Sequence, residues 1–173
     1  MNITIITFSP HGNTRKAGEI IAEYFNSEHI HSQLIDITGN EILWVKKDFK
    51  SFFKSIPKHD ILMIGCPVYA HTFPSVMIEF LNSLPEPDET FGKYAIPFVT
   101  YGNVSSGTAL YDMAKKLKIK KRNSIMGLKI NTTHSLCQSL YNENKTQREY
   151  KDLYPLLPKM LQKVKTLNAN TLQ

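Results

Sequence analysis

Five small or polar residues crowd one short stretch of the sequence, where an expected strand leads into an expected helix: Ser9, His11, Gly12, Asn13 and Thr14. The first N–H groups of a helix lack partners within it, and the helix dipole favours an anion at this end. Hydroxyl and amide side chains add donors, and the glycine permits a close backbone approach. The stretch therefore predicts a phosphate site; capping of the helix by Ser9 or Asn13 is the alternative interpretation.

Two further loops carry aromatic residues at the ends of expected strands. The loop "GCPVYAHTFP" follows the apolar run 60–65, and "TYGNVSSG" closes the run 94–102. In open parallel sheets, ligands bind beyond the carboxyl ends of the strands. Tyr69, Phe73 and Tyr101 stand at such ends, where a core side chain is not expected. Aromatic rings beside a phosphate corner favour a flat, phosphorylated ring as the ligand.

The elements that must position these loops alternate along the chain. Periodicity and turn residues predict strands over 2–8, 31–37, 60–65, 94–102 and 124–130, although Pro97 conflicts with the fourth. They predict helices over 13–26, 38–56, 74–84, 105–119 and 145–167. Alternating strands and helices imply parallel strands joined by right-handed crossovers. The sequence predicts one α/β domain over residues 1–173, with an open, doubly wound sheet.

Composition excludes several classes of protein. A content of 42% hydrophobic and 21% charged residues argues against disorder. No apolar run approaches the roughly 20 residues of a membrane span, and the N-terminal "MNITIITF" resembles a strand rather than a signal peptide. We therefore expect a cytoplasmic protein without a membrane partner. Cys66 and Cys137 lack the spacing of a metal site, and we expect reduced thiols, with Cys66 an inert buried residue.

The net charge of +6 is distributed unevenly. The stretch "KKLKIKKR", from Lys115 to Arg122, holds six basic residues in eight positions. The favoured interpretation is a solvated helix end, where the dipole favours cations. A docking patch for an acidic partner protein is the second interpretation. Nucleic acid is the least favoured, because no aromatic residues alternate with the basic ones.

Taken together, the three loops resemble those of the flavodoxins and related FMN proteins. "SPHGNT" is similar to the family's phosphate loop, and "GCPVYAHTFP" and "VTYGN" are similar to its third and fourth loops. The likeness is strongest to the flavodoxin-type domain of ferredoxin–flavodoxin fusion proteins, over about residues 1–140, without the cluster domain, which two cysteines cannot support. The resemblance implies a three-layer sandwich around a five-stranded parallel sheet in the order 2-1-3-4-5.

The resemblance also implies non-covalent FMN. Its phosphate is expected on Ser9 to Thr14 and its ring between the 67–73 and 101–107 loops. The implied cofactor-binding residues are Ser9, His11, Gly12, Asn13, Thr14, Pro67, Val68, Tyr69, Ala70, His71, Thr100, Tyr101, Gly102, Asn103 and Gly107. No catalytic acid, base or nucleophile and no metal site is expected, because the protein positions and tunes the flavin.

The expected function is electron transfer, to a redox partner protein or a small-molecule acceptor. The alternative is an FMN-dependent NAD(P)H or quinone oxidoreductase. A second alternative is a flavin-free binding module. It stays open because His11 occupies a position where the family carries a hydroxyl residue, and because "PVYAHTF" contains no glycine.

Overall fold

The computed structural model of the chain describes residues 1–102, 105–132 and 150–171. Its strands are β1 (Asn2–Thr7), β2 (His31–Asp36), β3 (His59–Pro67), β4 (Phe91–Tyr101), β5 (Asn123–Ser124) and β6 (Leu128–Asn131). Its helices are α1 (Asn13–Ser27), α2 (Glu41–Trp44), α3 (Phe49–Ser55), α4 (Ser75–Ser83), α5 (Ala109–Ile119) and α6 (Leu157–Thr171), with a 3₁₀ turn, η1 (Tyr154–Leu156), before the last.

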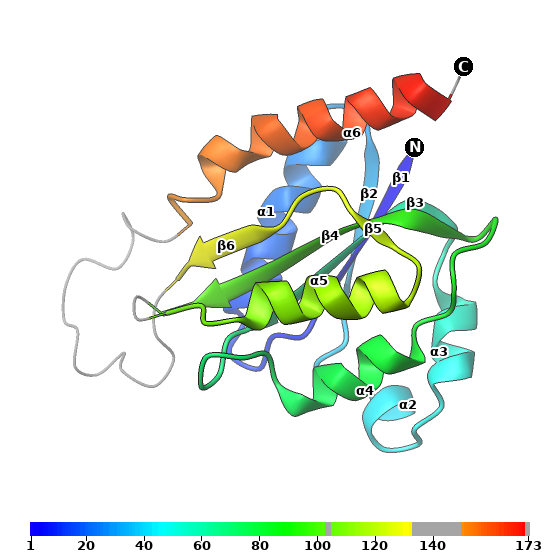
Figure 1. The fold of residues 1–173 in the computed structure, drawn as a ribbon, viewed down its shortest axis with the longest axis vertical. Helices are drawn as coiled ribbons and strands as arrows, with labels where there is room; N and C mark the ends of the chain where they lie inside the picture. Colours follow the sequence, from blue (N-terminus) through cyan, green and yellow to red (C-terminus); the bar gives the residue numbers. More distant parts are fainter. Residues whose placement is uncertain (103–104, 133–149, 172–173) are drawn as a thin grey trace.

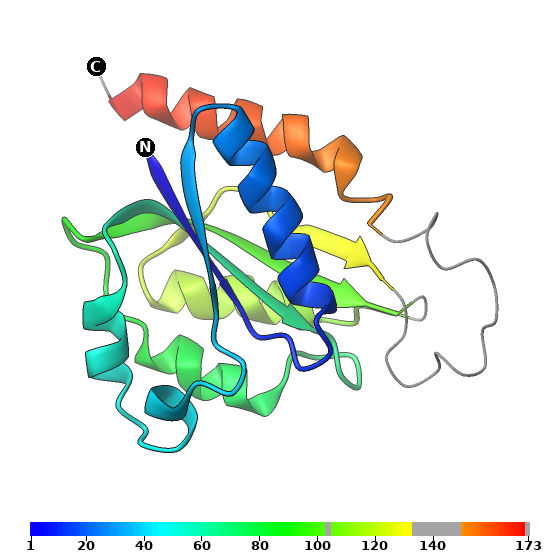
Figure 2. The ribbon, with the colours of Figure 1, turned by 180° about the vertical axis from the view of Figure 1, so that it is seen from behind.

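The strands form a parallel sheet in the order β2-β1-β3-β4-β5, and β6 pairs with β4 farther along that strand. Helices α1 and α6 cover one face of the sheet, and α2 to α5 cover the other (Figures 1 and 2). The predicted three-layer α/β fold and its strand order are therefore confirmed. The carboxyl ends of β1, β3 and β4 meet at one edge, as the sequence interpretation requires.

The fifth strand of the prediction is broken into two pieces. Ser124 pairs with Ala95 and Leu128 pairs with Phe98, but residues 125–127 have no paired residue in β4. In a parallel strand, every second residue forms its hydrogen bonds with the same neighbouring strand. Ala95 faces the fifth strand, because its carbonyl accepts from the Ile125 N–H (3.0 Å), and Pro97 is two residues farther along. Pro97 therefore faces the fifth strand without an N–H to give. The conflict that the proline poses in the sequence is resolved by this gap.

Two helix predictions need correction. The predicted helix 38–56 is divided into α2 and α3, because Lys47 adopts a positive φ of 55° and Asp48 caps a new helix by accepting from the Ser51 N–H (3.0 Å). The last helix begins only at Leu157, after η1. Pro158 takes the second position of this helix, within the first turn, where the N–H that it lacks would have no partner in the helix. Residues 145–149 of the prediction lie outside the described part of the chain.

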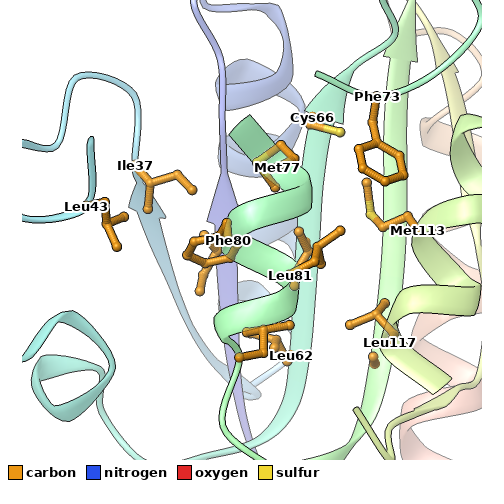
Figure 3. Packing of buried hydrophobic residues seen from close by; sticks show 14 of the residues in the cluster. Ile37, Leu43, Leu62, Cys66, Phe73, Met77, Phe80, Leu81, Met113 and Leu117 are labelled. Atoms are coloured by element: carbon orange, nitrogen blue, oxygen red, sulfur yellow. The ribbon is translucent and has the colours of Figure 1, made fainter. Parts of the chain in front are cut away.

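A hydrophobic core fills the space between the sheet and α2 to α5. Phe80, Met77 and Leu81 of α4 point into it, next to Leu62 of β3 and Met113 of α5 (Figure 3). A second core lies under α1 and α6 on the opposite face. One core packs on each face of the sheet, and this close packing makes the sheet a rigid support for the loops at its carboxyl edge.

The basic stretch from Lys115 to Arg122, which includes the end of α5, is only partly a solvated helix end. Lys121 has a positive φ of 58°, which turns the chain inward, and Arg122 is 1% exposed. Its Nη1 donates to the Pro85 carbonyl (2.7 Å), and burial lowers its pKa to about 10 despite the nearby Asp88. The expectation of a solvated cation is wrong for Arg122.

His59, at the other end of the sheet from the loops, predicts a pH-dependent stability. Its ring is buried, its Nδ1 lies 3.1 Å from the Pro57 carbonyl, and burial together with Arg122 lowers its pKa below the ordinary value of about 6.5. The unfolded chain therefore takes up this proton first as pH falls, and the stability present above pH 6.5 declines toward the folded pKa. We expect urea midpoints at pH 7.5 and 5.5 to differ less in His59→Gln than in the unchanged protein. An exposed histidine gives the control, since His31→Gln should keep the full difference.

Candidate functional site

The loop between β1 and α1 is ordered by its own hydrogen bonds. Ser9 Oγ accepts from the Arg15 N–H (2.9 Å), the Ser9 carbonyl accepts from the Gly12 N–H (3.0 Å), and Gly12 adopts a φ of +84°. Ser9 thus contributes to capping, as one interpretation of the sequence proposed. The backbone N–H groups of His11 and Thr14 have no acceptor within the described residues. Because capping does not use these two N–H groups, they can donate to a bound anion.

Side chains far apart in the sequence tie this loop to its neighbours. The buried hydroxyls of Thr14 and Thr100 lie 2.7 Å apart, which joins the start of α1 to the end of β4. From the C-terminal segment, the Tyr150 hydroxyl donates to the Asn13 carbonyl (3.1 Å). The Ser9 N–H donates to Thr38 Oγ1 (2.6 Å) after β2. The corner is therefore held from three sides.

The loop after β3 makes a tight turn at residues 69–72. The N–H of Tyr69 donates to the Thr72 carbonyl (2.8 Å), and the N–H of Thr72 donates back (3.1 Å). Ala70 and His71 have positive φ values of 47° and 68°, as in a type I′ turn, although glycine or asparagine is favoured there. The His71 carbonyl accepts from the Thr108 N–H (3.0 Å), so the turn is fastened to the residues before α5.

These loops enclose a cavity of about 280 Å³. Eleven of the predicted residues line it: Ser9, His11, Asn13, Thr14, Pro67, Val68, Tyr69, Ala70, Thr100, Tyr101 and Gly102. Gly12, His71 and Gly107 are not in its lining, although Gly12 has the positive φ of the first loop and Gly107 packs against His71 of the 69–72 turn. Asn103 lies outside the described residues. The structure thus brings the three predicted loops to one site.

Sequence reasoning missed two lining residues, Pro10 and Thr132. Thr132 follows β6, and its N–H donates to the Tyr101 carbonyl (2.9 Å). The rule about carboxyl ends, applied to the fifth strand as well as to the others, would have found it. Pro10 lies within the predicted phosphate loop, but it has no N–H to donate.

The aromatic residues divide into lining and core. Tyr69 is 37% exposed at the cavity, where burial raises its pKa and keeps the phenol neutral, and Tyr101 is half-buried beside it. Phe73 is buried in the hydrophobic core near Cys66 and Met113 (Figure 3), so the expectation that it leaves the core is wrong. The 69–72 turn reverses the chain and directs Phe73 back inward. Burial also raises the pKa of the Cys66 thiol, which packs as the expected inert residue.

The described residues contain no group of three or more histidine, cysteine or acidic side chains able to hold a metal ion. None of their helices is long and apolar enough to cross a membrane.

Residues 1–127 match the model of a protein family described as NADPH-dependent FMN reductase. The chain belongs to this FMN reductase family. No match was found among curated proteins. The predicted likeness to the flavodoxin domain of ferredoxin fusions stays a prediction, because the matching family model is that of the FMN reductases.

Solved structures share the flavodoxin-like fold. An archaeal flavodoxin is 18% identical with a TM-score of 0.52, covering 80% of this chain and 90% of its own. A flavodoxin of Streptococcus pneumonia TIGR4 is 16% identical with a TM-score of 0.59, covering 78% and 88%. An NADH:FMN oxidoreductase in its apo form is 20% identical with a TM-score of 0.58, covering 73% and 75%. At these identities the likeness concerns the fold.

The cavity of this FMN reductase family member suits a phosphorylated ring. Among the described residues, none that lines the cavity is acidic, and none accepts a hydrogen bond from the backbone N–H groups of His11 and Thr14 at the α1 N-terminus. An added Cβ at Gly12 would meet nothing within 4 Å, which leaves the approach to this corner open. Two tyrosines and the apolar Val68 and Ala70 supply flat and apolar walls. The donor set therefore fits FMN.

Proposed function

We propose that this chain binds FMN without a covalent bond and acts as an FMN-dependent NAD(P)H oxidoreductase in the cytoplasm. The observation that carries the proposal is that polar donors and two tyrosines meet around one cavity whose described lining contains no acidic residue. Membership of the NADPH-dependent FMN reductase family supports the choice of cofactor and of reaction class. Bound FMN would supply hydride and single-electron transfer, which no side chain here provides.

The residues of the chain bind and orient the cofactor. The N–H groups of His11 and Thr14, the Asn13 side chain and the α1 dipole would hold the phosphate. The walls at Tyr69 and Tyr101 would hold the ring, and the fixed 69–72 turn would present backbone groups to its edge. Since none of the described residues that line the cavity carries a carboxylate, they do not repel an anionic reductant.

The visible absorption spectrum of the purified protein, before and after addition of FMN, tests the proposal. We expect the bands of oxidised flavin, changed in position or intensity upon binding. The absence of flavin bands, together with an unchanged spectrum on titration, would contradict the proposal and favour a flavin-free binding module.

An electron carrier is the second candidate function, favoured by the positive charge along α5 and after it. The two candidates differ in what they need. The FMN-loaded oxidoreductase should oxidise NAD(P)H with a quinone acceptor and no added reductase. A carrier should fail in that assay and accept electrons only from a partner protein.

A further inference from the structure

The gap in the fifth strand opens a second hollow, on the side of α5 away from α4. It measures about 360 Å³, and its walls include Pro97, Leu110, Tyr111, Ala114, Met126 and Lys129. In Figure 1 the segment between β5 and β6 runs back beside α5. Because residues 125–127 have no paired residue in β4 near Pro97, they expose apolar surface that a continuous strand would cover.

One lysine lines this hollow, and two more lie on the helix that bounds it. Tyr111, Lys115 and Lys118 follow one another at helical spacing on one face of α5, and Lys129 lines the hollow from β6. Tyr111 is 69% exposed, and the three lysines are exposed as well. Within the described chain, none of these lysines has an ion pair or a side-chain hydrogen bond. By contrast, Lys116 donates to Asn82 and Lys121 pairs with Glu86 (2.8 Å).

The net charge of the protein arises within the segment that contains α5 and β6. Residues 105–132 contain seven basic residues and one acidic residue, Asp112, which gives the same excess of +6 as the complete chain. The remainder of the chain therefore carries equal numbers of basic and acidic residues. Three of these basic residues, Lys115, Lys118 and Lys129, lie on or beside the hollow, so apolar surface and exposed positive charge adjoin there.

We propose that this α5–β6 face (Tyr111, Lys115, Lys118, Met126 and Lys129) docks an acidic protein partner that inserts one apolar side chain into the hollow. The hollow would bind the apolar side chain, which would form the buried centre of the interface. The lysines would pair with carboxylates on either side of it and form the polar rim. Duplex DNA offers phosphates without an apolar anchor, so it fits the lysines and leaves the hollow unused.

The α5–β6 face also adjoins the candidate cofactor site. Gly107 belongs to the wall of the hollow, and an added Cβ there would lie 1.9 Å from the His71 carbonyl oxygen. Docking would thus place the partner against the residues that fasten the 69–72 turn. The docking itself needs no flavin, whereas its use for electron exchange rests on the proposed function.

Two synthetic heptapeptides test the docking, each with six acidic residues around a centre that is phenylalanine in one and serine in the other. Titration into ¹⁵N-labelled full-length protein at low ionic strength should shift amide signals from residues 107–118 and 124–129. The phenylalanine peptide should bind about tenfold more tightly, since burial of the ring adds to the charge attraction. Tyr111→Ser should reduce this difference. Equal affinity of the two peptides, or shifts confined to other surfaces, would overturn the proposal.

A matched charge control separates docking from general attraction. Lys115→Glu/Lys118→Glu should weaken phenylalanine-peptide binding at least about tenfold, whereas Lys50→Glu/Lys54→Glu makes the same charge change on exposed α3 residues and should weaken it far less. Equal losses in both variants would overturn the proposal, and so would duplex DNA binding this face more tightly than the phenylalanine peptide does. Peptide binding without any FMN binding would leave the docking intact and contradict the proposed function instead.

Discussion

Asn13→Asp is expected to lower the affinity for FMN at least about thirtyfold while leaving the fold as stable as before. Asn13 is the first residue of α1 and lines the cavity. A carboxylate in the first turn of a helix interacts favourably with the dipole, so the variant should not lose stability. Two like charges about 4 Å apart near a protein surface repel by about 4 kcal/mol, and half of that repulsion against the phosphate lowers affinity about thirtyfold.

Riboflavin provides the control for this variant, because it has the ring of FMN and no phosphate. Fluorescence titration should give the same riboflavin affinity for the Asn13→Asp variant and the unchanged protein. Raised salt should recover part of the lost FMN affinity by screening. An equal loss of affinity for both flavins would show that residue 13 contacts the ring, and unchanged FMN affinity would place the phosphate elsewhere.

The alternation of strands and helices was sufficient to predict a parallel sheet and the convergence of three loops, whereas the strand order 2-1-3-4-5 was implied by the resemblance to the flavodoxins. Alternating strands and helices fix a parallel sheet, and parallel strands bring their carboxyl ends to one edge. The polar residues from Ser9 to Thr14 predict the N-terminus of a helix, whose first backbone N–H groups lack partners within the helix. No long-range information is needed for these steps.

The errors arose where one backbone angle or a distant partner decides the outcome. Phe73 returns to the core because the preceding turn uses positive φ values at Ala70 and His71, which few sequence signals announce in the absence of glycine. Arg122 is buried because Lys121 turns the chain inward toward Pro85. The Thr14–Thr100 contact joins residues 86 positions apart, which no local pattern can specify.

Gly107→Ala is expected to reduce both the stability and the affinity for FMN, although Gly107 is absent from the cavity lining. Gly107 has a φ of +48°, and an added Cβ would lie 1.9 Å from the His71 carbonyl oxygen and 2.5 Å from the His71 Cβ. Relief of that overlap must move the 69–72 turn, whose Tyr69 and Ala70 line the cavity. Left-handed strain of about 1–2 kcal/mol and overpacking of about 1–3 kcal/mol should add, to about 2–5 kcal/mol less unfolding free energy.

Gly39→Ala separates the two contributions, since Gly39 has a similar φ of +70° and open space around its Cβ position. It should cost only the strain of about 1–2 kcal/mol and leave FMN affinity unchanged. Urea denaturation and flavin titration of both variants give the comparison. If the two alanine variants lose equal stability and bind FMN alike, then the contact between Gly107 and His71 does not position the turn. A loss of FMN affinity confined to Gly107→Ala would show that the residues before α5 set the geometry of the flavin-facing turn without touching the cavity themselves.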